Sequence, residues 1–188
     1  MRVVGGRFSG RQLARPQTNA IRPTSDRLRE SLFNILAHAY GLPTPGTRVL
    51  DLFAGTGALG IEALSRGAAT ALFVENSVEG RGILRTNMET FGLNGIARIL
   101  RRDASTLGRA GTIAPFDLVF LDPPYGKGLG ERALKSAAEG GWLSPDSLCV
   151  VEERADIEIE LPPAFARLDR RETGDTQLAF LRFAAGTT

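Results

Sequence analysis

The stretch RVLDLFAGTGALG (residues 48–60) decides the fold. An apolar strand runs into a loop that contains Gly55, Gly57 and Gly60, and a helical pattern follows. Glycines at such a turn let the backbone approach a ligand closely, and the start of the helix supplies free N–H groups. The spacing matches G-x-G-x-x-G, but a tight strand-to-helix turn without a ligand has the same pattern. The motif therefore predicts a strand, a loop and a helix, and only suggests a nucleotide-like ligand.

Strands and helices alternate after this loop. Strands are predicted at 48–53, 71–75, 97–103, 117–122 and 147–153, and helices at about 57–66, 77–91 and 129–139. Two final strands surround a Gly174–Asp175 turn. This pattern predicts an α/β, Rossmann-like fold whose mostly parallel, seven-stranded sheet ends in an antiparallel C-terminal hairpin. Gly80 and Gly82 favour an irregular start for the helix at 77–91.

The N-terminal segment has a different character. A small hairpin is predicted within residues 1–16, and a helix begins at Thr24 or Ser25 and ends near Gly41. We place a boundary near residue 45, which gives an N-terminal extension (1–44) and a main domain (45–188). Residues 1–30 contain seven arginines and two acidic residues, a net charge of +5, whereas the whole chain carries +2. A concentrated positive segment favours contact with nucleic acid phosphates, although a solvated arm without such a partner has the same composition.

The composition is that of an ordinary soluble protein. The chain has 188 residues, of which 43% are hydrophobic and 23% charged, and no apolar run is long enough to span a membrane. The N-terminus has no apolar signal-peptide core, and the single Cys149 cannot form an internal disulfide, so we expect a cytoplasmic protein. No cluster of metal-ligand residues is visible, and we expect no metal.

Carboxylates mark the ends of four predicted strands. Asp51 lies in the first strand, and Glu75, Asp103 and Asp122 end the next three. The carboxyl ends of parallel strands meet at one edge of the sheet, where ligands bind. A rim of carboxylates suits a cationic ligand with a ribose better than a pyrophosphate, so S-adenosylmethionine (SAM) is favoured over NAD. Each carboxylate taken singly is also compatible with a solvated strand end.

The residues DPPY (122–125) end the fourth predicted strand and indicate a catalytic site. Prolines cannot donate to the ladder and fix the backbone, so the carbonyl of Pro123 is aimed in advance. Asp122 and this carbonyl can each accept one N–H of an exocyclic base amine, which directs the nitrogen lone pair toward a methyl donor. Tyr125 offers a ring on which the base can stack. The alternative is a strand-ending turn with a packed tyrosine.

The order of these motifs resembles that of class I SAM-dependent methyltransferases that modify exocyclic base amines. The blocks MRVVGGRFSGRQL (1–13) and RPTSDRLRESLFNIL (22–36) are similar to the bacterial 16S rRNA (guanine(966)-N2)-methyltransferase family, and the similarity covers nearly the whole chain. The resemblance implies methyl transfer from SAM to N2 of a specific guanine in 16S rRNA. The substrate would be the small ribosomal subunit or its assembly intermediate, and the enzyme is expected to be a monomer.

The resemblance also implies roles for individual residues. Those expected to contact SAM are Asp51, Phe53, Ala54, Gly55, Thr56, Gly57, Glu75, Asp103, Ala104 and Asp122. Asp122 and Pro123 would hold the amine, and Tyr125 would stack on the base. The resemblance places Arg22, Thr24, Arg27 and Arg29 in an arm that faces RNA. From their charge and position, we also expect RNA contacts from Arg7 and Arg11 of the same basic segment and from Lys127, just past the DPPY residues.

Three other functions remain open at this stage. The DPPY site does not distinguish N2 of guanine from N6 of adenine, so another base-amine methyltransferase acting on DNA or RNA has the same motif. A SAM-binding ribosome-assembly factor without turnover would need a broken site, and residues 122–125 are intact. An NAD dehydrogenase would share the glycine pattern but would need a hydride-transfer site that the sequence does not show.

Overall fold

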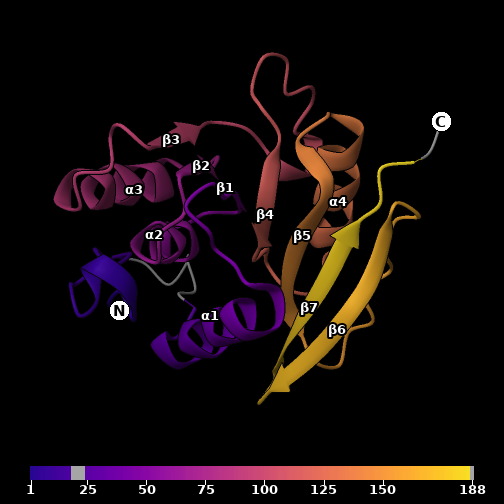
Figure 1. The fold of residues 1–188 in the computed structure, drawn as a ribbon, viewed down its shortest axis with the longest axis horizontal. Coiled ribbons are helices and arrows are strands. Elements are labelled where there is room, and N and C mark those ends of the chain that lie inside the picture. Colours follow the sequence, from indigo (N-terminus) through magenta and orange to yellow (C-terminus); the bar gives the residue numbers. More distant parts are fainter. Residues whose placement is uncertain (18–23, 187–188) are drawn as a thin grey trace.

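The centre of the molecule is a seven-stranded sheet in the order β3-β2-β1-β4-β5-β7-β6, seen in a computed structural model that describes residues 1–17 and 24–186 (Figure 1). The strands are β1 (Arg48–Leu52), β2 (Thr70–Val74), β3 (Ala97–Leu100), β4 (Phe116–Leu121), β5 (Leu143–Arg154), β6 (Phe165–Thr173) and β7 (Thr176–Phe183). The first five are parallel, and β7 pairs antiparallel with both β5 and β6. The predicted fold class is confirmed.

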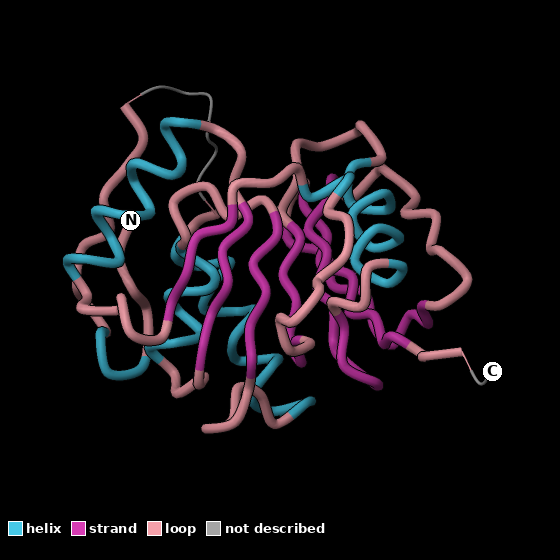
Figure 2. The backbone as a smooth tube through the Cα atoms, turned by 90° about the horizontal axis from the view of Figure 1, so that it is seen from above, coloured by secondary structure: helices cyan, strands magenta, loops and turns pink. Residues whose placement is uncertain are grey.

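The helices cover both faces of this sheet (Figure 2). They are α1 (Asp26–Tyr40), α2 (Ala58–Ser65), α3 (Val78–Thr90) and α4 (Leu129–Glu139), with short 3-10 turns η1 (Gly6–Phe8) and η2 (Ala104–Thr106). Apolar residues of α1, α2 and α3 share one core with one face of the sheet, and those of α4 and η2 share a second core with the other face. Within residues 1–17 and 24–186, no helix is both long and apolar enough to cross a membrane.

The order in which strands are added to the sheet changes direction between β1 and β4. Strands β1, β2 and β3 follow one another outward, and the chain then returns to place β4 on the other side of β1. Asp51 of β1 pairs with Phe120 of β4. The carboxyl ends of these two strands are therefore neighbours at the point where doubly wound sheets bind their ligands.

Three local features differ from the sequence-based expectation. Strand β3 ends at Leu100, so Asp103 lies in the following loop. Helix α3 is regular from Val78, because the Ser77 hydroxyl accepts the Gly80 N–H at 3.0 Å and caps its first turn. The predicted N-terminal hairpin is a single antiparallel bridge between Arg2 and Gln12 that closes around η1.

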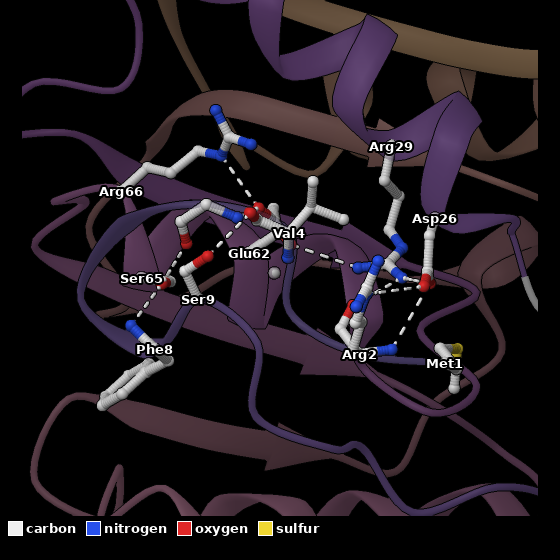
Figure 3. A network of polar contacts seen from close by, with 12 residues as sticks. Met1, Arg2, Val4, Phe8, Ser9, Asp26, Arg29, Glu62, Ser65 and Arg66 are labelled. Atoms are coloured by element: carbon white, nitrogen blue, oxygen red, sulfur yellow. Dashed lines mark hydrogen bonds and ion pairs between the residues drawn. The ribbon is translucent and has the colours of Figure 1, made fainter.

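Glu62 of α2 fastens the N-terminal segment to the sheet domain (Figure 3). Its side chain is fully buried. One oxygen accepts from Arg29 Nη1 at 3.1 Å and from the Val4 N–H at 2.9 Å. The other accepts from Arg66 Nε at 2.8 Å and from the Gly5 N–H at 2.7 Å. Four donors thus compensate for removing this charge from water.

Arg29 of α1 completes the network. Its guanidinium also contacts Asp26 at 2.5 Å and donates to the Arg2 carbonyl at 2.8 Å. Burial lowers the pKa of Arg29, while the charges of Glu62 and Asp26 oppose that shift. The predicted boundary near residue 45 falls in the loop between α1 and β1, but residues on both sides of it share one apolar core.

We expect Glu62→Ala to lower the free energy of unfolding by about 3–5 kcal/mol, because it leaves the Arg29 charge buried without its main partner. Glu139→Ala is the matched control, since Glu139 is exposed and only 3.9 Å from Lys135. Its effect should be within about 0.5 kcal/mol. Urea unfolding of the three proteins measures both values, and equal effects of the two substitutions would show that the Glu62 network does not anchor the fold.

Candidate active site

A cavity of about 570 Å³ lies at the carboxyl ends of the central strands. Most of the predicted cofactor and amine residues line it: Asp51, Phe53, Ala54, Gly55, Thr56, Glu75, Asp103, Ala104, Asp122, Pro123 and Tyr125. The volume is within the range of pockets that hold small molecules. The glycine loop and the DPPY turn thus form the walls of one space.

Glu75, the first residue after β2, holds the glycine loop in place. One carboxylate oxygen accepts the Gly55 N–H at 2.7 Å, and the other accepts the Ser77 N–H at 2.8 Å. Phe53 has a φ of 59°, which is unfavourable for a bulky residue and occurs here beside the cavity. A carboxylate can accept about four hydrogen bonds, so Glu75 keeps the capacity to accept ribose hydroxyls.

The other two glycines of the motif serve packing. Neither Gly57 nor Gly60 lines the cavity. A Cβ on Gly57 would lie 2.4 Å from Leu84, and one on Gly60 would lie 2.4 Å from Phe73. Gly57 has a φ of 80° and allows close packing at the start of α2, and its contact with SAM stays a prediction.

Asp51 is a buried carboxyl group in the cavity wall. Its Oδ2 accepts the Gly60 N–H at 3.0 Å. Burial raises the pKa of Asp51 to about 8 and the charge of Glu75 adds to the rise, while the hydrogen bond from Gly60 opposes it. A cationic ligand beside this group would favour its charged form, so the wall is suited to an ammonium group.

Asp103 reaches the cavity from the loop after β3. Its Oδ1 accepts the Ser105 N–H at 2.8 Å and the Ser105 hydroxyl at 2.7 Å, and so caps η2. The side chain is exposed, and the next residue, Ala104, is buried in the cavity wall. Capping fixes the orientation of the carboxylate even though it does not belong to the strand.

Asp122 follows β4 directly and is held from the N-terminal segment. The Thr24 hydroxyl donates to Asp122 Oδ2 at 2.9 Å, and both residues line the cavity. Thr24 precedes Ser25, whose hydroxyl accepts the Leu28 N–H at 3.1 Å and caps α1. Thr24, predicted to face RNA, is therefore part of the cavity wall and contacts the carboxylate of the DPPY turn.

Tyr125 is fixed in the wall by its phenol. The hydroxyl donates to Glu152 of β5 and lies 3.4 Å from the Thr176 hydroxyl. Burial raises the pKa of Tyr125, and the hydrogen bond to Glu152 adds to the rise. Glu152 was not among the predicted site residues, because it lies within β5 and its place beside the DPPY turn depends on the pairing of β5 with β4.

The predicted RNA-contacting residues divide into three groups. Arg7, Arg11, Arg27 and Lys127 are exposed. Arg22 lies outside the described residues. Arg29 is completely buried, so its predicted contact with RNA is wrong: its charge is used to bind Glu62 and Asp26.

Arg7 and Arg11 stack on an aromatic pair. Phe8 and Phe91 lie 5.1 Å apart between ring centroids. Arg7 lies 4.6 Å from the Phe8 centroid, and Arg11 lies 4.5 Å from that of Phe91. Arg11 also donates to the Thr90 carbonyl at 2.6 Å. These cation–π contacts restrain two exposed positive charges.

Comparison with known proteins identifies the relatives of this chain. A family model described as Conserved hypothetical protein 95 matches residues 1–182. The Ribosomal RNA small subunit methyltransferase D of Escherichia coli (strain K12) is 39% identical over 173 residues, 92% of this chain and 84% of that protein. The chain belongs to this family of methyltransferases.

Two further relatives agree with this assignment. The Putative rRNA methyltransferase YlbH of Bacillus subtilis (strain 168) is 37% identical and covers 92% of this chain and 93% of that protein. The solved structure of the putative methyltransferase yhhF from Escherichia coli superimposes with a TM-score of 0.81 at 32% identity and covers 99% of both chains. The likeness extends over the N-terminal segment as well as the sheet.

We expect binding of SAM, the predicted cofactor, to release up to one proton near pH 7. The pKa of about 8 keeps the Asp51 carboxyl protonated in the free enzyme, and a bound ammonium group would favour the charged form. The release should vanish as the pH rises well above 8. Titration calorimetry in two buffers of different ionisation enthalpy counts the protons. Asp51→Asn should abolish the difference between buffers, and equal enthalpies for the unmodified enzyme would contradict the prediction.

We expect Thr24→Val to lower kcat about 10- to 100-fold, because a hydrogen bond to a charged group is worth about 1.5–3 kcal/mol. Thr24→Ser keeps the hydroxyl and should retain most of the activity. Steady-state kinetics with both variants test this, and equal losses in the two would contradict it.

Proposed function

We propose that this protein transfers the methyl group of SAM to the exocyclic N2 of a guanine in 16S rRNA. The observation that carries the proposal is the shared cavity: the glycine loop beside β1 and the DPPY turn after β4 face the same space. Several relatives bear the name Ribosomal RNA small subunit methyltransferase D. The proposed substrate is therefore the small ribosomal subunit or its assembly intermediate.

The residues of the cavity fit SAM. Asp51 and the glycine loop would hold its amino-acid end, Glu75 its ribose, and Asp103 with Ala104 its adenine. Burial raises the pKa of Asp51 and the charge of Glu75 adds to the rise, and a cationic ligand would favour the charged form of this carboxyl group. When bound, SAM supplies a methyl group on a positively charged sulfur.

The DPPY turn positions the acceptor amine. Asp122 accepts one N–H and the Pro123 carbonyl the other, so the nitrogen lone pair faces the methyl group. The target base must leave its stacked position to reach the cavity, which costs a few kcal/mol, and stacking on Tyr125 offsets part of that cost. Asp122 is also a base placed to take the proton that the amine loses.

The N-terminal extension (1–44) supplies contacts to the RNA backbone, and the main domain (45–188) holds SAM and the base. Arg7, Arg11 and Arg27, together with Lys127 beyond the DPPY turn, are exposed cations suited to phosphates. We propose that the protein acts as a monomer in the cytoplasm, where its RNA substrate is made.

A further relative supports N2 of guanine as the acceptor. The tRNA (guanine(6)-N2)-methyltransferase of Thermus thermophilus is 36% identical over 59% of this chain and 35% of that protein. Because that relative acts on tRNA by its name, the class of RNA has to be measured separately from the modified atom.

The decisive experiment incubates the enzyme and radiolabelled SAM with small ribosomal subunits from cells that lack this activity. Digestion of the RNA should give label in N2-methylguanosine at one site. Label in N6-methyladenosine would show that the acceptor base is adenine and not guanine. No label in subunits, naked rRNA, tRNA or DNA would overturn the proposed activity.

We expect Asp122→Ala to reduce turnover by at least about 10³-fold while SAM affinity changes by less than about threefold, because Asp122 positions the amine. Asp156→Ala is the control, since Asp156 forms an exposed ion pair with Arg154. Single-turnover kinetics and calorimetry measure the two effects. Parallel loss of turnover and SAM binding would contradict separate roles.

We expect Arg7→Ala combined with Arg11→Ala to weaken RNA binding and to flatten its salt dependence. Each lost phosphate contact should reduce the slope of log K against log salt by about 0.7–0.9. Arg171→Ala serves as control, because Arg171 is an exposed arginine on β6 that pairs with Asp169. Filter binding at several salt concentrations gives the slopes. An unchanged slope in the double variant would remove these arginines from the RNA interface.

A further inference from the structure

Two carboxylates follow neighbouring positions of β4 and β5. The parallel register pairs Leu121, the last residue of β4, with Val151 of β5, and Asp122 and Glu152 are the residues that come next in the chain after this pair. Neighbouring strands are about 4.8 Å apart, so the two residues begin close together. Both side chains line the cavity, and Glu152 is 7% exposed.

Tyr125 links this pair to the position expected for the base. Its phenol donates to Glu152, and its ring lines the same cavity wall. Asp122, Tyr125 and Glu152 all line this cavity, so the ring and both carboxylates border one space. A base stacked on this ring would present its edge to the two carboxylates together.

The chemistry of this wall suits a base edge that only donates. Ionised carboxylates accept hydrogen bonds and cannot donate them. Guanine carries two adjacent donors, N1–H and the N2 amine, on its Watson–Crick edge. Adenine and 2,6-diaminopurine have a lone pair on N1 instead, which a carboxylate would repel.

We propose that Glu152 accepts the guanine N1–H while Asp122 accepts an N–H of the N2 amine, so that Glu152 selects guanine as the target base. The inference rests on the proposed function and adds to it the residue that chooses the base. The DPPY turn alone binds any exocyclic amine, and Glu152 supplies the missing discrimination. A flipped base is read in this way, by hydrogen bonds to its edge and stacking on its face.

The test compares guanine with 2,6-diaminopurine at the methylated position of otherwise identical RNA. Both bases carry the 2-amino group, and they differ at N1 and at the substituent on C6. The unmodified enzyme should prefer guanine on the order of 10- to 100-fold in kcat/KM. In Glu152→Gln the preference should fall to about one or reverse, because the glutamine amide can donate to the N1 lone pair.

Tyr125→Phe is the matched control. It removes the phenol that donates to Glu152 but keeps the carboxylate and the aromatic face. It should lower kcat/KM for both RNAs by the same factor and leave the preference unchanged. The preference is the ratio of two kcat/KM values measured on one enzyme preparation, so partial unfolding of a variant lowers both values equally and leaves the ratio unchanged. Glu152→Ala provides a second variant.

Three results would overturn the inference. They are equal use of the two bases by the unmodified enzyme, an unchanged preference in Glu152→Gln and Glu152→Ala, and a loss of preference in Tyr125→Phe equal to that in Glu152→Gln. The last would mean that Glu152 acts only through Tyr125. Failure of the unmodified enzyme to methylate guanine in any RNA would instead overturn the proposed function itself.

Discussion

The buried carboxylate of Glu62 is the interaction on which the active site depends. It accepts hydrogen bonds from the first residues of the chain, from Arg29 of α1 and from Arg66 at the end of its own helix. The four donors come from three segments of the chain: the N-terminal strand-like segment, α1 and the end of α2. Because Glu62 lies in the helix that follows the glycine loop, the same contact fixes the start of the chain and α1 against the cofactor side of the sheet.

Anchoring α1 has a direct consequence for catalysis. Thr24 precedes the capped start of α1 and donates to Asp122, so the position of the carboxylate proposed to bind the amine depends on a helix outside the sheet. A second link reaches the glycine loop: Asn87 of α3 accepts the Ala14 N–H at 2.8 Å and donates to the Thr56 carbonyl at 2.9 Å. The segment proposed to bind RNA therefore contacts both halves of the active site.

The sequence predicted the fold well because apolar strands, glycine turns and helix caps are local signals. The predictions failed where the role of a residue depends on contacts with residues that are distant in the sequence. Arg29 belongs to a basic segment, yet it forms a buried ion pair with Glu62, which lies 33 residues away in the sequence. Gly57 matches a ligand-binding motif, but its φ of 80° and the closeness of Leu84 in another helix also favour glycine there. Glu152 could be found only by placing β5 beside β4, because its meaning comes from the neighbouring Asp122.

The distribution of charge on the protein favours different surfaces for the phosphates and for the target base of the RNA. Glu75, Asp122 and Glu152 give the cavity an acidic wall, whereas Arg7 and Arg11 are exposed on the N-terminal segment. Phosphates are repelled by the first surface and attracted by the second, so an RNA can present only a base to the cavity. Methyl transfer removes the positive charge from the sulfur of the cofactor. The acidic wall then holds the product less strongly than SAM, and the arrangement that draws the cofactor in also favours release after the reaction.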